Sequence, residues 1–552
     1  MKKKYRIIPL LFLTVFISIS INTFSADNVP VYSVYELTFK GKTYTVKDNP
    51  VRDIELLSVW QHEQSLNTIP IYGFYDGDGQ GSKNGAVFKV RFCPMETGTW
   101  TLIQVRSNDR DLNRQHQGLK INAIASDHPG FWEVDNDSPG NRWYKRSNGS
   151  HQYIAGNTMY SFLSEYYKGD STGGNIRDDI INNSGYFKKV RLAVTGDRYP
   201  NPVSKPFLNE NGEPTDDGNY CHRPNPEWFN NRVDLAVKTA FEKDLITDLI
   251  LNGPDAPDSR TILKATKNNS DPGPFLRYIA ARYGSFPNVW LCISNEYDIQ
   301  TPNYNCDEMI RAGQCLQDCL PYSTPVSVHA SSKDWDENLN TAIPWFDHVI
   351  IQNKLKKSDQ SADKILWNYF LGGANQPVVN DELAYEGNGD GWTEEDVIEA
   401  FLGAFMGGGY ASTGHKPANK DGHYFSGNFK PSEHTAADNL NWFREMIDKN
   451  ITFWKMKPVA VTNVTGNNAI IFRNHDMRHR IMMWEDNEYV IAGSSAKRGI
   501  KALLPEGSWT VKSYDLISRK ETVISENAEG NTNITIPDSR AFMVHFKKNG
   551  QR

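Results

Sequence analysis

Residues 289–298, Val-Trp-Leu-Cys-Ile-Ser-Asn-Glu-Tyr-Asp, and residues 377–387, Pro-Val-Val-Asn-Asp-Glu-Leu-Ala-Tyr-Glu-Gly, decide the fold. In each stretch an apolar run leads into a carboxylate, Glu296 in the first and Glu382 in the second. A strand of a parallel barrel is buried on both faces, so it reads as an almost continuous apolar run, and the chemistry follows at its carboxyl end. The two glutamates are separated by about three of the eight units of a (β/α)8 barrel, which takes roughly 250 residues. This spacing predicts that they follow the fourth and seventh strands.

The middle of the chain holds eight such apolar runs, separated by amphipathic stretches typical of helices. An open doubly wound sheet is the alternative, but it normally carries a glycine-rich phosphate turn after its first strand, and the sequence has none there. We therefore predict an α/β protein built on a (β/α)8 TIM barrel. The expected strands are 152–154, 189–194, 246–251, 289–294, 325–329, 348–352, 377–381 and 408–412.

The character of the sequence changes on both sides of this barrel. Before it and after it, short alternating strands are broken by turn residues, which is typical of antiparallel β-sandwiches. The predicted organisation is a signal peptide at 1–25, an N-terminal β-sandwich at 26–126, the barrel at 127–454 and a C-terminal β-sandwich at 455–552.

The first residues have the form of an export signal. A basic start is followed by the apolar run 7–21, and Thr23 and Ser25 provide the small residues expected before a cleavage site at Ala26. The apolar run is short for a transmembrane helix, and no cysteine follows it that would carry a lipid anchor. We expect a periplasmic or secreted protein that is not inserted in the membrane after cleavage.

The composition of the chain argues against nucleic acid as a partner and is compatible with carbohydrate. The 552 residues carry a formal net charge of only −6, with acidic and basic residues interspersed, so no cationic surface for nucleic acid is indicated. With 14 Trp and 25 Tyr the chain is rich in flat aromatic faces that suit sugar rings, although packing in cores accounts for most of them. A carbohydrate substrate is expected, with no cofactor and no metal, and the sequence does not indicate the oligomeric state.

Six cysteines allow 15 pairings, among which the sequence does not choose. Cys306, Cys315 and Cys319 lie close together, so a local disulfide is the expectation in an oxidising compartment. A zinc site is the weaker alternative, because no histidine stands at ligand spacing beside them.

The two glutamates suit hydrolysis of a glycosidic bond. In a retaining enzyme two carboxyl groups stand about 5 to 5.5 Å apart, one protonating the leaving oxygen and the other attacking the anomeric carbon. We predict Glu296 as the acid/base and Glu382 as the nucleophile, while Asp381 should point away from Glu382 because strand side chains alternate. Asn295 is positioned to donate to the sugar 2-hydroxyl.

Other side chains at strand ends complete the predicted pocket. Polar groups there can contact sugar hydroxyls, and aromatic rings can stack on sugar faces. A structural role is an open alternative for each of them. The predicted substrate-binding residues are Asn295, Asn157, Arg198, Asn252, His329, Gln352, Tyr385 and Trp392.

These features resemble those of clan A glycoside hydrolases, and more closely those of apiosidase-like barrels from bacteria. The segments 73–79, 88–92 and 98–100 are similar to the small β-sandwich that precedes such barrels, and 128–132 with 153–158 resembles their entrance and first strand. The C-terminal part resembles an accessory domain of the collagen-binding type. The first strand of an apiosidase usually ends Gly-Asp-Thr-Ala-Trp, whereas residues 156–160 read Gly-Asn-Thr-Met-Tyr, which weakens the case for apiose as the substrate. The resemblance implies a retaining hydrolase that acts on plant or algal polysaccharides or their oligosaccharides.

Two other functions fit the same sequence. A non-catalytic glycan-binding protein would not need Glu296 and Glu382 to face each other. A polysaccharide lyase would use a Tyr or His base with a neutralising cation or Arg, and would not depend on Glu382. An inverting hydrolase is a variant of the main hypothesis, which is excluded if the two carboxyl groups stand closer than about 6 Å.

Overall fold

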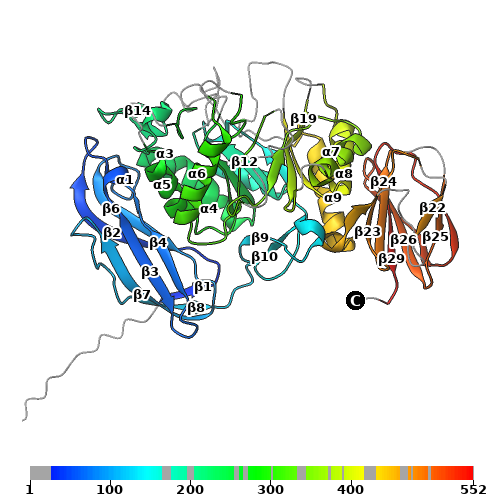
Figure 1. Ribbon diagram of the computed structural model, residues 1–552, viewed down its shortest axis with the longest axis horizontal. Coiled ribbons are helices and arrows are strands. Elements are labelled where there is room, and N and C mark those ends of the chain that lie inside the picture. Colours follow the sequence, from blue (N-terminus) through cyan, green and yellow to red (C-terminus); the bar gives the residue numbers. More distant parts are fainter. Residues whose placement is uncertain are drawn as a thin grey trace, which may run out of the picture.

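The eight apolar runs form one parallel sheet in the computed structural model (Figure 1). The structure describes residues 27–164, 176–195, 204–253, 260–264, 271–299, 303–331, 343–370, 374–387, 391–415, 431–459, 470–473, 476–494 and 499–550. The prediction of a (β/α)8-type barrel with antiparallel sheets before and after it is confirmed. Residues 1–25, the predicted signal peptide, lie outside the described residues.

The barrel strands follow one another in chain order around the ring, with β11 next to β20. β12, β15, β16 and β19 are buried at every residue, as expected for strands with helices outside and packed side chains inside. The strands are β11 (Ala155–Thr158), β12 (Lys189–Ala193), β15 (Ile246–Ile250), β16 (Val289–Cys292), β17 (Val326–Ser327), β18 (Val349–Ile351), β19 (Val378–Glu386) and β20 (Tyr410–His415).

The ring closes between β17 and β18 through a single parallel bridge that joins His329 to Ile350. At the other end of this seam, the backbone N–H of Val326 donates to the Asp347 side chain at 2.8 Å. The two short strands are thus joined at their two ends.

The first barrel strand begins three residues later than the sequence predicted. Tyr153, in the expected strand 152–154, donates its backbone N–H to Asp448 Oδ1 at 2.6 Å instead of to a neighbouring strand. Asp448 lies on the last barrel helix, so this segment leads into the barrel against that helix, and strand pairing starts at Ala155.

Helices cover the outside of the barrel. They are α2 (Ile176–Ser184), α4 (Asp234–Glu242), α5 (Gly273–Tyr283), α6 (Cys306–Cys319), α7 (Ser358–Phe370), α8 (Glu394–Met406) and α9 (Ala436–Asn450). The α6 helix begins with a capping box in which Asn305 and Glu308 bond each other's backbone N–H groups. No helix among the described residues is long and apolar enough to cross a membrane.

The predicted local disulfide is wrong. All six cysteines are free. Cys306, Cys315 and Cys319 all lie on α6, where side chains one turn apart have Cβ atoms about 5 to 6 Å from each other. A disulfide needs Cβ atoms about 3.5 to 4.5 Å apart, so the straight helix keeps Cys315 and Cys319 from bonding.

A β-hairpin covers the amino-terminal end of the barrel, below the strands in Figure 1. It consists of β9 (Trp132–Val134) and β10 (Tyr144–Arg146). The Tyr144 ring lies 4.5 Å from that of Trp290 in β16, and its hydroxyl is 2.9 Å from Nδ1 of His348, the residue before β18. The hairpin therefore forms the floor of the barrel.

The N-terminal sheets pack on α4 and α5 through buried charges. Arg91 on β6 bonds Asp234 of α4, and Arg282 of α5 reaches both Asp234, at 2.8 Å, and Asp76 of the N-terminal part, at 2.9 Å. Burial alone would raise the pKa of Asp234, but Arg282 and Arg91 hold it well below its usual range. The first of these sheets has five strands in the order β1 (Asp27–Pro30), β8 (Lys120–Ile124), β7 (Gly98–Ser107), β3 (Leu56–His62) and β4 (Thr68–Tyr72). The second has three strands in the order β2 (Tyr35–Tyr44), β6 (Gly85–Phe92) and β5 (Phe74–Tyr75).

After α9, the chain forms a six-stranded and a three-stranded antiparallel sheet with a core of their own, at the right of Figure 1. The six-stranded sheet has β21 (Lys457–Val459), β23 (Arg480–Trp484), β24 (Glu488–Gly493), β29 (Phe542–Lys548), β26 (Trp509–Asp515) and β27 (Lys520–Ala528) in that order. The other has β22 (Ile471–Arg473), β25 (Ile500–Leu503) and β28 (Asn531–Ile534).

Candidate active site

Glu296 follows β16 on a stretch that continues to bond both neighbouring strands. Asn295 donates its backbone N–H to Asn252 O on one side at 3.0 Å, and Tyr297 donates to His329 O on the other at 3.2 Å. Between them, Glu296 has φ of 44°, in the left-handed region that non-glycine residues seldom occupy. Such strained backbone concentrates at functional sites, where the surrounding structure imposes it.

Glu382 lies within β19 and is 6% exposed. Its Oε1 accepts a hydrogen bond from the hydroxyl of Tyr160, which follows β11, and lies 3.8 Å from Nδ1 of His329. Burial and the Glu382 charge hold the pKa of Tyr160 well above its usual value, so the hydroxyl keeps its proton and donates it to the carboxylate. Burial and the charge of Glu382 also hold the pKa of Tyr385 well above its usual value, so this second hydroxyl near the carboxylate keeps its proton.

Arg191, in β12, links the surroundings of the two glutamates. Its Nη1 donates to the Tyr160 hydroxyl at 2.8 Å, and its Nη2 donates to Oδ1 of Asn295 at 2.7 Å. Through Tyr160 it supports Glu382, and through Asn295 it holds the residue next to Glu296. One guanidinium thus connects the ends of the first, fourth and seventh strands.

His329 is neutral and its ring orientation is defined. Burial and the charge of Arg191 hold its pKa well below the usual value. Its Nδ1 lies 2.6 Å from Asn295 Oδ1, an acceptor, so Nδ1 carries the proton and donates it. Nε2 is then a bare acceptor, and it has no partner among the described residues.

Glu296 is half-buried and contacts the end of the sixth strand. Gln352 donates from Nε2 to Glu296 Oε1 at 2.8 Å and also to the Ser331 carbonyl. The predicted residues Glu296, Asn295, His329, Gln352, Glu382 and Tyr385 are therefore brought together at the carboxyl end of the barrel.

A buried charge cluster fills the barrel interior. Lys189 Nζ lies 2.5 Å from Asp381 Oδ1 and 3.4 Å from Asp248 Oδ2, and Ser412 donates to Asp381 at 2.6 Å. Burial alone would raise the pKa of Asp381, but Lys189 and Arg191 hold it well below its usual range. The regular register of β19 up to Asn380 sets Asp381 beside Ser412 in the barrel interior. A shift in the register between Asn380 and Ala384 then interrupts the alternation used in the sequence argument, and Glu382 reaches Tyr160.

Two of the predicted residues have other partners. Asn157 donates to Asn183 on α2 at 2.8 Å, because Gly156 takes the inward position of β11 beside Ser412 and the next residue must face the helices. Asn252 donates to Ser294 at 2.8 Å, so it stabilises the chain that leads to Glu296.

The remaining predicted positions are less informative. Trp392 is 5% exposed and pairs through its backbone with Gly387, so its ring is packed rather than presented to solvent. Arg198 lies outside the described residues. Glu386 lies four residues after Glu382 in β19. Its carboxylate accepts hydrogen bonds from the backbone N–H groups of Thr435 and Ala436 and so caps the start of α9.

Tyr160, Arg191 and Lys189 were missed by the sequence argument. Lys189 and Arg191 are charged residues inside a strand that is otherwise apolar, and such residues are almost never buried unless they are paired. That pattern was the available signal. Tyr160 carried none, because a tyrosine after a strand is common in cores. Among the described residues, no group of three His, Cys, Asp or Glu could hold a metal ion.

Comparison with known proteins gives two family matches. Residues 187–415 match the family model described as "Apiosidase-like, catalytic domain", and residues 28–105 match a domain of unknown function, DUF5060. The first range contains Arg191, Glu296 and Glu382. A comparison with curated proteins found no match.

Solved structures share the fold. A "putative glycoside hydrolase" from Bacteroides vulgatus is similar at a TM-score of 0.71 and 19% identity, over 95% of this chain and 100% of that one. A glycoside hydrolase of family 5 from the same species has a TM-score of 0.57 and 15% identity, over 77% and 94% of the two chains. A third structure, described as a glycoside hydrolase, has a TM-score of 0.57 and 14% identity, over 77% and 98%. At these identities the likeness establishes the fold.

Proposed function

We propose that this protein is a retaining glycoside hydrolase with Glu382 as nucleophile and Glu296 as acid/base. The match of residues 187–415 to an apiosidase-like catalytic domain, preceded by a DUF5060 match, supports a hydrolase. The observation that carries the proposal is the set of donors around Glu382. Tyr160 donates to its carboxylate, and Arg191 stands behind Tyr160. A hydroxyl that donates to a carboxylate stabilises its negative charge, which an attacking group must carry, and a guanidinium that donates to that hydroxyl strengthens the effect.

The reaction proceeds in two displacements. Glu382 attacks the anomeric carbon while Glu296 gives its proton to the leaving glycosidic oxygen, which leaves a glycosyl ester on Glu382. Glu296, now ionised, takes a proton from water, and the resulting hydroxide attacks the anomeric carbon and releases Glu382. The sugar keeps its anomeric configuration because the carbon is inverted twice.

Asn295 is proposed to bind the 2-hydroxyl of the sugar. Its Oδ1 accepts from both Arg191 and His329, which fixes the direction of the amide group and reserves Nδ2 as the donor. A donor to the 2-hydroxyl strengthens its bond as charge develops at the transition state. The acceptor Nε2 of His329 can take a hydrogen bond from a second hydroxyl.

The substrate is proposed to be a plant or algal polysaccharide, or an oligosaccharide derived from it. The site has no unpaired cationic side chain among its described members, which supports a neutral sugar. The export signal predicted for residues 1–25 supports action in the periplasm or outside the cell, where an enzyme meets polysaccharides.

A polysaccharide lyase is the competing reaction, because Tyr160 next to Arg191 has the residue types of a lyase base and its neutralising cation. Burial and Glu382 raise the pKa of Tyr160, however, so this hydroxyl is a poor base. The hydrolase proposal therefore accounts better for the same residues.

The test compares wild type, Glu296→Gln, Glu382→Gln and the matched control Glu386→Gln on plant and algal polysaccharides and aryl glycosides. Azide is added to alanine variants at 296 and 382. We expect the variants of Glu296 and Glu382 to lose activity. Azide should give a glycosyl azide of inverted configuration only with the variant that lacks Glu382. Activity that persists without Glu382 would support a lyase. Binding without turnover on any substrate would support a glycan-binding protein.

A further inference from the structure

A cavity of about 500 Å³ lies at the end of the barrel opposite to Glu296 and Glu382. Its walls come from the β9/β10 hairpin and from residues that immediately precede barrel strands, such as Thr324 before β17, Asp347 before β18 and Gln376 before β19. Glu296 follows β16, and Glu382 lies in β19 where it reaches Tyr160 beyond the carboxyl end of β11, so the two sites lie toward opposite ends of the barrel. A volume of this size is typical of ligand pockets.

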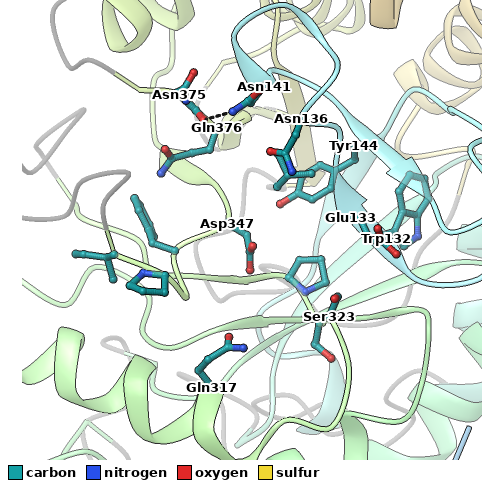
Figure 2. A pocket seen from close by; sticks show the side chains of 16 residues that line it. Trp132, Glu133, Asn136, Asn141, Tyr144, Gln317, Ser323, Asp347, Asn375 and Gln376 are labelled. Carbon is teal, nitrogen blue, oxygen red and sulfur yellow. Dashed lines mark hydrogen bonds between the residues drawn. The ribbon is translucent and has the colours of Figure 1, made fainter. Parts of the chain in front are cut away.

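The lining is polar. Amide groups predominate, together with two carboxylates and several hydroxyls, and among the described residues no Lys or Arg lines the cavity. Figure 2 shows the Asp347 carboxylate in the middle of the view, facing the side where the Tyr144 hydroxyl and the Asn136 amide project. The amide residues are Asn136, Asn141, Gln317, Asn375 and Gln376.

Gln376 provides the second observation. Its residue is only 4% exposed, yet neither its side-chain oxygen nor its nitrogen has a hydrogen-bond partner in the described structure. A buried amide with no partner costs free energy, and such a group in a native protein calls for a ligand or a water at that place. Its amide carries one acceptor and two donors, and the described structure leaves all of them without a partner beside this cavity.

Asp347 adds an anchored acceptor. Its Oδ2 accepts the Val326 N–H at 2.8 Å, which fixes the carboxylate and leaves Oδ1 for a ligand. Burial raises the pKa of Asp347 to about 7, so near neutral pH this group is protonated part of the time and can also donate. Groups that both accept and donate match sugar hydroxyls, which do the same.

The lining decides the class of ligand. The carboxylates of Glu133 and Asp347, without any cation beside them in the cavity, oppose phosphates and uronates. No cluster of three His, Cys, Asp or Glu among the described residues provides a metal site. A neutral polyhydroxylated molecule remains.

We propose that this cavity is a second saccharide site, which binds the end of a neutral oligosaccharide at the amino-terminal end of the barrel. The choice of a saccharide among neutral polyols rests on the proposed function. The site would hold a polysaccharide on the enzyme while another part of the same chain, or another chain, is cleaved at the opposite end.

The test is hydrogen exchange followed by mass spectrometry on the full-length Glu382→Gln protein, with cellotriose, xylotriose or mannotriose at millimolar concentration. We expect at least one of them to slow exchange in peptides that cover 132–146 and 343–349. Trigalacturonate should give no protection there. Protection by none of the neutral trisaccharides, or protection by trigalacturonate, would overturn the proposal.

Matched variants locate the effect. Gln317→Leu and Gln376→Leu should each weaken the protection, by about tenfold in the saccharide concentration required, which corresponds to about 1.4 kcal/mol. Gln314→Leu is the control, because Gln314 lies on the same helix but pairs with Asp318 at its exposed surface. Protection that is unchanged in both cavity variants would overturn the proposal.

Separate outcomes identify which proposal fails. A wild-type protein that hydrolyses glycosides but gains no protection at 132–146 overturns only the second site. Protection at 132–146 without turnover by wild type on any substrate supports the second site and overturns the hydrolase proposal. If Gln376→Leu raises the unfolding midpoint while the wild-type cavity gains no protection from any saccharide, the cavity is a packing defect and the proposal is wrong.

Discussion

Arg191 Nη1 lies 2.8 Å from the Tyr160 hydroxyl, which itself donates to Glu382. The tyrosine therefore transmits the positive charge of a fully buried arginine to the carboxylate without an ion pair between Arg191 and Glu382. Because the hydroxyl accepts one hydrogen bond and donates the other, its proton has only one direction in which to point. This relay makes Glu382 dependent on a residue of the first strand.

Replacement of Tyr160 by Phe should lower kcat/KM by about 10- to 100-fold, because a hydrogen bond to a charged group contributes about 1.5 to 3 kcal/mol. Assays with aryl glycosides give the rate, and urea unfolding checks that the fold is retained. Tyr220→Phe, in the 3-10 turn Gly218–Tyr220, is the control and should keep wild-type activity, because the charged groups that act on its hydroxyl are Glu210, Asp217 and Arg223 and do not include Glu382. Unchanged kcat/KM in Tyr160→Phe would contradict the relay.

Loss of one partner from the Lys189–Asp381 pair should destabilise the protein by about 3 to 5 kcal/mol, because a buried charge is left without its partner. The variants are Lys189→Met, Asp381→Asn and the double replacement, compared by urea unfolding. The double variant should be less destabilised than the sum of the two single ones. Additive effects would mean that Ser412 and Asp248 alone determine the energetics of the cluster.

Stability should fall as the pH rises from about 4 to about 6 through the ionisation of Asp448. Burial raises its pKa to about 6, whereas the unfolded chain releases this proton near pH 3.9. Between these values the folded state binds more protons, so folding is favoured at the lower pH and the contribution is lost as the pH passes about 6.

Asp448→Asn keeps an acceptor for the Tyr153 N–H but cannot ionise. Relative to this variant, wild type should lose about 2 kcal/mol between pH 4 and pH 7 in urea unfolding, as a shift of about two pKa units implies. The control is Asp438→Asn on the exposed side of the same helix, which should follow wild type. Parallel curves for wild type and Asp448→Asn would refute the assignment.

The protein should contain six titratable thiols when it is denatured without reductant, because all six cysteines are free. A thiol reagent gives the count, and the unfolding midpoint should be the same with and without dithiothreitol. Each missing pair of thiols would reveal a disulfide. Cys315→Ala and Cys319→Ala would then show whether the α6 pair forms it.

The sequence was sufficient for the architecture and for the strand ends. Short apolar runs such as Val289–Cys292, alternating with amphipathic stretches, favour strands buried on both faces, and their order along the chain predicts the order in the ring. Glu296 and Glu382 could be predicted for the same reason, because each follows or ends such a run. The proximity of His329 and Gln352 to these glutamates also follows from barrel topology.

What the sequence did not reveal depends on single-residue shifts. A shift of one residue in the register of β11 decides whether Asn157 faces the pocket or α2. A four-residue strand does not indicate this register in its own sequence, because it depends on the pairing with the neighbouring strands. The irregularity in β19 likewise lies between Asn380 and Ala384, where strict alternation would not let both Asp381 and Glu382 reach the inside of the barrel. The Arg191–Tyr160 contact joins residues of two strands by side-chain reach, which strand order alone does not determine.

The buried cluster of Arg91, Asp234, Arg282 and Asp76 bears on how this architecture can be inherited. Each part contributes one arginine and one aspartate, and each arginine bonds the aspartate of the other part. Gene recombination that joined this barrel to a different leading domain would leave Asp234 without Arg91 and Arg282 without Asp76, unless the new partner provided equivalent charges. The two parts should therefore be exchanged during evolution as one cassette.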